Sequence, residues 1–161
     1  MRGYERGFHL RNDYYNGINL AFLLNVRSDD SCRRAELATS PAEIETERAE
    51  AVACFIHARK VRTEVLSICE SLLKENPAPT GKKATKQAMK EYLHNRYWVV
   101  ATQAEAYLGL GQTAKANKTY REAYSLDPES WMVDSTESQR KNLKRLLAVS
   151  APLKYVKAGA E

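Results

Sequence analysis

The chain has 161 residues, of which 43% are apolar and 28% are charged. This length suits one folded domain with a sizeable core, and the composition excludes collagen-like and disordered classes. The 25 basic and 20 acidic residues give a net charge of +5, an excess too small to indicate nucleic-acid binding by itself.

The three cysteines are few and widely spaced, which excludes a disulfide framework and suits a reducing compartment. No apolar run reaches the roughly 18–20 residues that a membrane span requires. The first residues also lack the apolar segment of a secretory signal. We therefore expect a cytoplasmic protein with no membrane partner.

Residues 1–12 share their spacing with a later stretch of the chain, which predicts that they are the end of a repeated unit. Such a half-unit cannot bury its apolar side alone, so we expect a fragment of a longer protein. Its apolar edge near Tyr4, Phe8 and Leu10 should either fold back on the helix that begins near Asp13 or self-associate with a second chain. The matching positions are Tyr4, Gly7 and Leu10 in the first stretch and Tyr120, Ala123 and Leu126 in the second.

Residues 13–76 are expected to form a pair of helices with an inserted polar segment. Asp13 offers an N-cap to a helix that reaches about Val26. A polar break follows from Arg27 to Thr39, and Ser40-Pro41 then predicts the start of a helix over 41–75.

The second half of the chain predicts more helices and no strand. A helix is expected to start near Lys83 and to run into the stretch 97–130, so that 82–130 forms a second unit. Thr136 and Gln139 have the spacing of a capping box and predict a final helix over 135–150. No alternation of period two occurs, so the fold class is all-α, with about five helices in a single domain.

Residues 97–130 contain small and aromatic residues at the signature positions of one helix-turn-helix repeat of roughly 34 residues. The stretch resembles the tetratricopeptide repeat family, although Gln103 and Val100 depart from its pattern. The resemblance implies an array of helical hairpins, an α-solenoid fragment in which 13–76 is a divergent repeat. The signature positions are Ala104, Tyr107, Gly111, Ala116, Tyr120, Ala123 and Pro128.

A second resemblance covers most of the chain. It rests on DYYNGINLAFLLN at 13–25, the helix around 61–69, YW at 97–98, AEAYLGLG at 104–111 and WMVDST at 131–136. This ordered set is similar to the TRAF-binding region of the apoptosis signal-regulating kinases, which are mitogen-activated kinase kinase kinases, and to related bacterial repeat proteins. The resemblance implies a regulatory signalling scaffold that binds partner proteins and controls an attached effector domain.

No residue pattern indicates catalysis, a metal site or a cofactor. Cys54 and His57 are three residues apart on a predicted helix, but zinc needs a second pair of ligands, which is missing. The stretch Thr80–Lys83 lacks the two glycines and the preceding strand of a phosphate loop. We therefore expect a protein that is not an enzyme.

The resemblance to tetratricopeptide repeats implies that the first helix of each hairpin lines a concave surface, and we expect this surface to bind a protein partner. In the repeat register this surface includes Trp98, Thr102 and Glu105, with the Glu105 carboxylate facing solvent. Aligning Ala21 with Ala104 adds residues from the helix after Asp13. Aromatic and amide side chains suit a peptide or a partner helix. The predicted partner-binding residues are Tyr15, Asn19, Phe22, Trp98, Thr102 and Glu105.

Two alternatives stay open at this point. The aromatic residues of the concave surface could be core residues that close the polar insertion. A nucleic-acid-associated scaffold would instead use two basic clusters, although the one that begins at Lys82 has no interleaved aromatic residue for base stacking before Tyr92. The clusters are Lys82, Lys83, Lys86 and Lys90, and Arg140, Lys141, Lys144 and Arg145.

Overall fold

The computed structural model describes residues 2–11, 13–149, 152 and 155. Within these residues every element is helical, which confirms the all-α class, and six α-helices stand where about five were expected. Their bounds are α1 (Arg2–Arg11), α2 (Tyr14–Leu37), α3 (Pro41–Glu75), α4 (Lys86–Gly109), α5 (Thr113–Tyr124) and α6 (Ser130–Val149), with a 3₁₀ turn η1 (Gly81–Lys83) before α4.

Three hydroxyl or carboxylate side chains fix where the long helices start. Asp13, Ser40 and Thr85 each accept a hydrogen bond from the backbone N–H three residues later, at 2.7, 3.2 and 3.1 Å. Such N-caps satisfy backbone donors that have no partner within the helix. The first two caps are the predicted ones. The third starts α4 shortly after the expected position near Lys83.

The predicted polar break at Arg27–Thr39 is wrong, because α2 continues through it to Leu37. The polar side chains there find partners inside the hairpin of α2 and α3. Ser28 is fully buried and its hydroxyl donates to the backbone carbonyl of Ala51 at 2.8 Å. Small and hydrogen-bonded polar residues therefore pack this part of α2, where the apolar pattern is absent.

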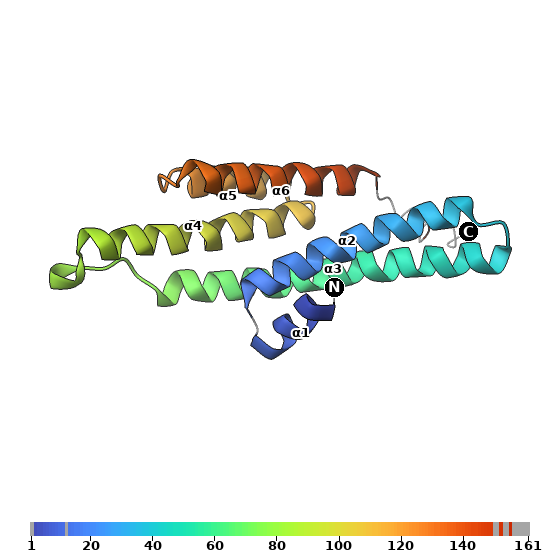
Figure 1. Ribbon diagram of the computed structural model, residues 1–161, viewed down its shortest axis with the longest axis horizontal. Helices are drawn as coiled ribbons and strands as arrows, with labels where there is room; N and C mark the ends of the chain where they lie inside the picture. The colour runs from blue at the N-terminus through green and yellow to red at the C-terminus, as the bar shows by residue number, and fades with distance from the viewer. Residues whose placement is uncertain (1, 12, 150–151, 153–154, 156–161) are drawn as a thin grey trace.

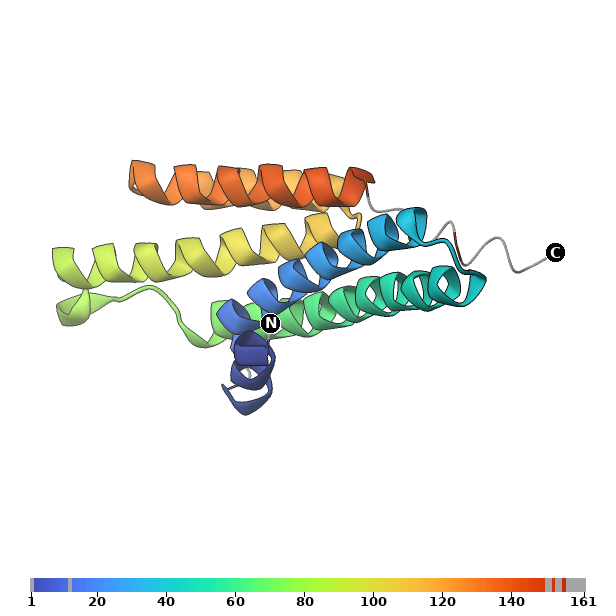
Figure 2. The ribbon, with the colours of Figure 1, turned by 45° about the vertical axis from the view of Figure 1, so that its right-hand side comes forward.

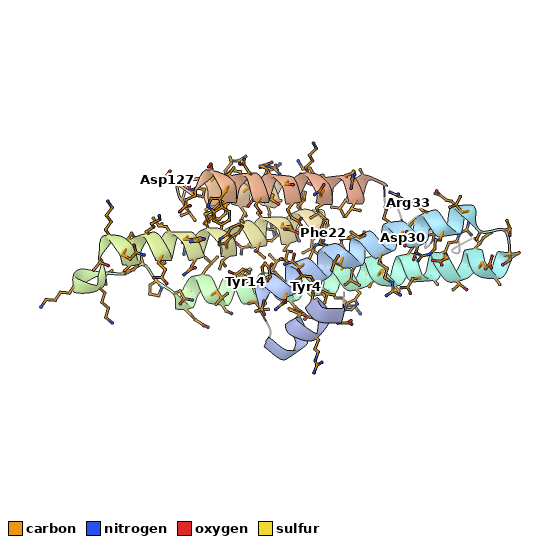
Figure 3. The ribbon with its side chains drawn as sticks, in the orientation of Figure 1. Tyr4, Tyr14, Phe22, Asp30, Arg33 and Asp127 are labelled. Carbon is orange, nitrogen blue, oxygen red and sulfur yellow. The ribbon has the colours of Figure 1, made fainter. Side chains whose placement is uncertain are left out.

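The described helices form two hairpins, α2–α3 and α4–α5, to which α1 and α6 are added (Figures 1 and 2). In both views α2 and α3 lie side by side as one hairpin, and α4 lies along it. Helices α5 and α6 cover the other side of α4, and α1 lies against the α2–α3 hairpin on the side away from α4. The far half of α2, with Asp30 and Arg33, extends beyond α4 (Figure 3).

The apolar N-terminal edge is covered by the chain itself. Phe8 is 1% exposed and belongs to the core between α2 and α3, and Tyr4 packs against the same core. A Cβ at Gly17 would meet the Phe8 ring at 2.7 Å, so the absence of a side chain there permits this close packing. The sequence-based reason for self-association is thus removed at Tyr4 and Phe8, while the side chain of Leu10 lies outside the described residues.

The last helix starts earlier than expected. Helix α6 (Ser130–Val149) confirms the expected final helix, but it begins at Ser130, so Thr136 lies inside the helix and the predicted capping box is wrong. The Thr136 hydroxyl lies 2.8 Å from the hydroxyl of Tyr97, which donates to the carbonyl of Met132 at 3.0 Å. This buried group of polar atoms connects α4 to α6.

The residues behind the repeat prediction lie mainly between α4 and α5. Ala104 and Ala116 are fully buried in one core cluster that also contains Tyr120 and Leu143. Gly111, in the turn between the two helices, has φ of 80°, a left-handed conformation that favours glycine. Small and aromatic signature residues thus pack where α4 and α5 meet, while the division of the chain into repeats stays a prediction.

No helix in the described part of the chain combines the length and the apolar character needed to span a bilayer.

Candidate functional site

A groove of about 370 Å³ lies between α2, α4 and α6, and we call it the central groove. Each helix contributes side chains from one face, because residues three or four apart lie together on a helix. The lining consists of Tyr15, Ile18 and Asn19 from α2, Trp98, Ala101, Thr102 and Glu105 from α4, and Ser135, Thr136, Ser138 and Gln139 from α6.

All the predicted partner-binding residues except Phe22 border this one groove. Phe22 packs instead against the core of α4, α5 and α6, on the side of α2 that faces α4 (Figure 3). The core alternative is therefore right for much of the Phe22 ring. Tyr15, by contrast, is 61% exposed and is not a core residue.

The rim of the groove has an aromatic cluster that includes residues not predicted as site residues. The Trp98 ring lies 5.8 Å from the Trp131 ring and 6.4 Å from the His94 ring, measured between centroids. Trp131 is 52% exposed. His94 and Trp98 are four residues apart on α4, a spacing that could have indicated their contact, whereas Trp131 comes from α6 and gave no such signal.

The floor of the groove carries a buried carboxylate. Glu105 is 8% exposed, so the prediction that it faces solvent is wrong. Its Oε1 atom accepts a long hydrogen bond of 3.4 Å from Nε2 of Gln139 on α6. Burial raises the pKa of Glu105 to about 7, although the positive charge of Arg62 acts in the opposite direction.

Behind this floor lies Arg62 of α3, which is fully buried. Its three guanidinium nitrogens have no hydrogen-bond partner among the described residues. Burial lowers the pKa of Arg62 to about 10, and the charge of Glu105 opposes that shift. The two charges thus stabilise one another across the α3–α4 contact without a direct hydrogen bond.

Gly109 provides the space for this arginine. A Cβ on Gly109 would lie 2.0 Å from Nε and 2.4 Å from Cζ of Arg62. Gly109 is four residues after Glu105, so both lie on the same face of α4. The absence of a side chain at position 109 therefore lets the guanidinium group pack directly against the α4 backbone.

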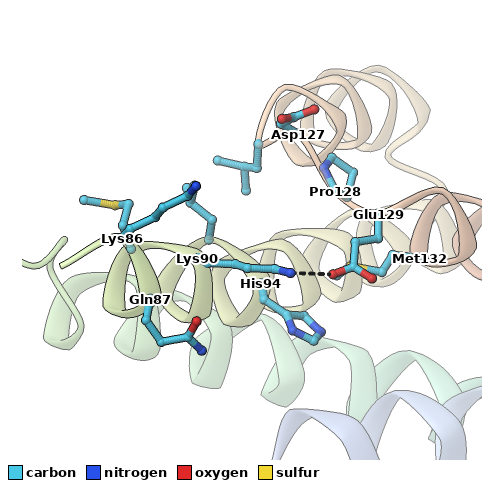
Figure 4. A pocket seen from close by; sticks show the side chains of 11 residues that line it. Lys86, Gln87, Lys90, His94, Asp127, Pro128, Glu129 and Met132 are labelled. Carbon is cyan, nitrogen blue, oxygen red and sulfur yellow. Dashed lines mark ion pairs between the residues drawn. The ribbon is translucent and has the colours of Figure 1, made fainter. Parts of the chain in front are cut away.

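Two further hollows flank the central groove. The α4–α6 hollow, of about 670 Å³, lies beside the start of α4, and an ion pair of 3.3 Å between Lys90 and Glu129 crosses it (Figure 4). The α2–α6 hollow, of about 760 Å³, includes Phe22 and Arg145. Along α6 the three hollows follow one another in chain order, from Met132 through Ser135–Gln139 to Asn142–Leu146.

The basic clusters are partly neutralised by neighbouring groups. The guanidinium of Arg140 bonds to Glu137 and Asn117, both at 2.9 Å, and lies over the Tyr120 ring. Lys90 is paired with Glu129. These contacts engage one residue of each cluster with a partner inside the protein.

The cysteine and histidine pair considered for metal binding has a simpler arrangement. The Cys54 thiol donates to the Glu50 carboxylate at 3.3 Å, and burial raises the pKa of Cys54 to about 11. In the part of the chain that the structure describes, no three histidine, cysteine or acidic side chains gather as a metal site.

Comparisons of the chain with models of protein families, with curated proteins and with solved structures gave no match. The two family resemblances accordingly stay predictions that rest on the residues alone.

Proposed function

We propose that the protein is a non-catalytic interaction module that binds a segment of a partner protein in the central groove. The observation that carries this proposal is the gathering of Tyr15, Asn19, Trp98, Thr102 and Glu105 around one groove. The repeat register aligns α2 with α4 from the sequence alone, and side chains of both helices border the same hollow. An exposed tryptophan lies beside it.

The chemistry of the groove suits a protein ligand. Tyrosine and tryptophan anchors dominate the binding energy of many interfaces. Tyr15 and Trp131 are large aromatic side chains that are more than half exposed, so a partner could still bury much of their surface. The amide and hydroxyl groups of Asn19, Ser135 and Ser138 in the groove lining can form hydrogen bonds to a backbone.

The size of the surface suits an extended segment. From Met132 to Leu146, α6 passes all three hollows over about 20 Å, from the rise of an α-helix. An extended chain of about six residues spans that distance. The central groove would bind the middle of such a segment.

The repeat register and the resemblance to a TRAF-binding region support a wider role. In this proposal α2–α3 and α4–α5 are successive tetratricopeptide-like hairpins, and α6 begins the next unit. The first helices of these units line the central groove. The module would act in cytoplasmic signalling by connecting a partner to an attached effector domain.

A peptide selection would test the proposal. A random nonapeptide library displayed on phage is selected against the purified chain, and the affinity of each selected peptide is measured by calorimetry. We expect Tyr15→Ala and Trp131→Ala each to weaken binding about tenfold or more, as for aromatic anchors.

Matched controls distinguish the groove from exposed apolar residues in general. Leu37 and Ile56 are 82% and 43% exposed and belong neither to the groove lining nor to the aromatic cluster of His94, Trp98 and Trp131, so Leu37→Ala and Ile56→Ala should leave the affinity unchanged. Peptides that bind all four variants as tightly as the original protein, or a library that yields no binder, would contradict the proposal.

A further inference from the structure

We propose that the partner segment carries a lysine or arginine whose cationic end binds Glu105 at the floor of the central groove. This inference rests on the proposed function and adds the chemical class of the segment. Its basis is the charge, the hydrogen bonding and the aromatic walls around one carboxylate.

The groove lining has one formal charge. Among the described lining residues, Glu105 is the one acidic side chain, and none is lysine, arginine or histidine. The neighbouring hollows differ, because both contain acidic and basic side chains. A segment that crosses the central groove therefore meets an isolated carboxylate, and a cationic side chain complements it.

The Glu105 carboxylate has unused capacity to accept hydrogen bonds. A carboxylate can accept about four hydrogen bonds, yet Gln139 donates a single long one. The guanidinium nitrogens of Arg62 form no hydrogen bond in the described structure. Neither Glu105 oxygen is a fully buried atom without a partner, so a donor from the partner can reach the carboxylate from the groove.

The aromatic side chains suit the rest of a long basic residue. Tyr15 of α2 and Trp98 of α4 both border the groove that has Glu105 at its floor. Aromatic faces attract ammonium and guanidinium groups, and the alkyl part of lysine or arginine packs on apolar surface. The groove therefore offers contacts to both parts of such a side chain.

The position of Arg62 does not oppose this assignment. Arg62 comes from α3 and lies against Gly109, whereas the groove is lined by α2, α4 and α6. The partner cation and Arg62 would approach Glu105 from different helices. Besides Arg62, the groups that act on the carboxylate are Tyr120 of α5 and the neutral amide of Gln139 on α6, while Tyr15 of α2 borders the same groove.

Binding of a cation should also be linked to the protonation of Glu105. With a pKa of about 7, this carboxyl group is protonated in much of the unbound protein at neutral pH. A bound cation favours the ionised form, so binding releases a proton and the affinity rises with pH. If only the ionised form binds the cation, the affinity increases about tenfold between pH 6 and pH 8.

The experiment uses the peptides selected through the groove, as defined by their sensitivity to Tyr15→Ala. We expect them to carry a lysine or arginine. Replacing that residue by glutamine should weaken binding at least tenfold to the original protein and less than threefold to Glu105→Gln. The control Glu64→Gln removes an exposed carboxylate of α3 outside the groove and should behave like the original protein.

The pH dependence gives a second readout that needs no variant. We expect the affinity of the original protein for these peptides to rise between pH 6 and pH 8, and a glutamine-substituted peptide to lose this rise. Groove-binding peptides without a basic residue, or a basic residue whose replacement weakens binding to the original protein and to Glu105→Gln equally, would overturn the inference but leave the proposed function intact. A library without groove binders would overturn both.

Discussion

At the scale of single residues, the buried pair of Arg62 and Glu105 is the most unusual feature of the molecule. Charges are seldom buried without direct hydrogen bonds, because removing them from water costs several kcal/mol each. Here both groups lie in the interior between α3 and α4, where burial lowers the pKa of Arg62 and raises the pKa of Glu105. The pair therefore has consequences for stability as well as for binding.

Replacing Glu105 by glutamine should change how stability depends on pH. The pKa of Glu105 is raised from 4.5 to about 7 by burial, so between these values the folded state binds more protons than the unfolded state. The free energy of unfolding contributed by this group therefore falls as pH rises through that window, and the variant lacks this loss. Relative to the original protein, we expect the free energy of unfolding of the variant to rise by up to about 3 kcal/mol between pH 4.5 and pH 7.5.

Urea denaturation at several pH values measures this difference. Glu64→Gln, at an exposed site on α3, should give a curve parallel to that of the original protein. Parallel curves for Glu105→Gln as well would show that the carboxyl group titrates normally in the folded protein.

At the scale of helices, the sequence predicted where helices start better than where they end. Asp13 and Ser40 could be recognised as caps because their hydrogen bonds are local. The continuation of α2 past Val26 could not be predicted in this way, because the hydroxyl of Ser28 donates to the carbonyl of Ala51, 23 residues away. Sequence patterns alone therefore predict a loop where polar side chains in fact form hydrogen bonds across a helical hairpin.

The candidate site was predictable to a similar degree. Tyr15 and Asn19 share a face of α2, and Trp98, Thr102 and Glu105 share a face of α4, as helical spacing predicts, whereas Phe22 of the predicted set packs against the core instead. The third wall comes from α6, whose start was misplaced. The burial of Glu105 depends on Arg62, which lies far away in the sequence and gave no local signal.

The continuity of α2 can be tested with two substitutions at Arg33, whose side chain is 65% exposed and pairs with Asp29 at 2.8 Å. Arg33→Ala and Arg33→Pro both remove the ion pair, but only proline removes a helix hydrogen bond and clashes with the preceding turn. We expect proline to lower the free energy of unfolding by about 3 kcal/mol relative to alanine. Equal stability of the two variants would mean that Arg27–Thr39 is a loop after all.

At the scale of the whole molecule, the two hairpins are offset along their length. The far half of the α2–α3 hairpin, with the end of α2 and the start of α3, extends beyond α4 in both views (Figures 1 and 2). The near half lies between α1 and α4. Opening the far half therefore breaks fewer contacts with other helices than opening the near half would. We expect the far half to unfold locally.

The three cysteines report on this difference, since each is buried and none forms a disulfide. Cys32 lies in the far half of the hairpin, whereas Cys69 is fully buried in the core with α1, and burial raises the pKa of Cys69 to about 12. We expect Cys32 to react fastest with N-ethylmaleimide and Cys69 slowest, because thiolate formation needs exposure.

Mass spectrometry of the labelled peptides over time measures the three rates. In urea above the unfolding midpoint, all three cysteines should react at similar rates, which is the control. Equal rates under native conditions would indicate that the molecule opens only as one unit.

The contact between Gly109 and Arg62 has a consequence for how this chain can vary in evolution. A side chain at position 109 would exclude an arginine at position 62, and without that cation a buried carboxylate at position 105 loses its internal counter-charge. The three positions should therefore change together. In related chains, an arginine on α3 with a glutamate and a glycine one helical turn apart on α4 would identify those that share the groove chemistry.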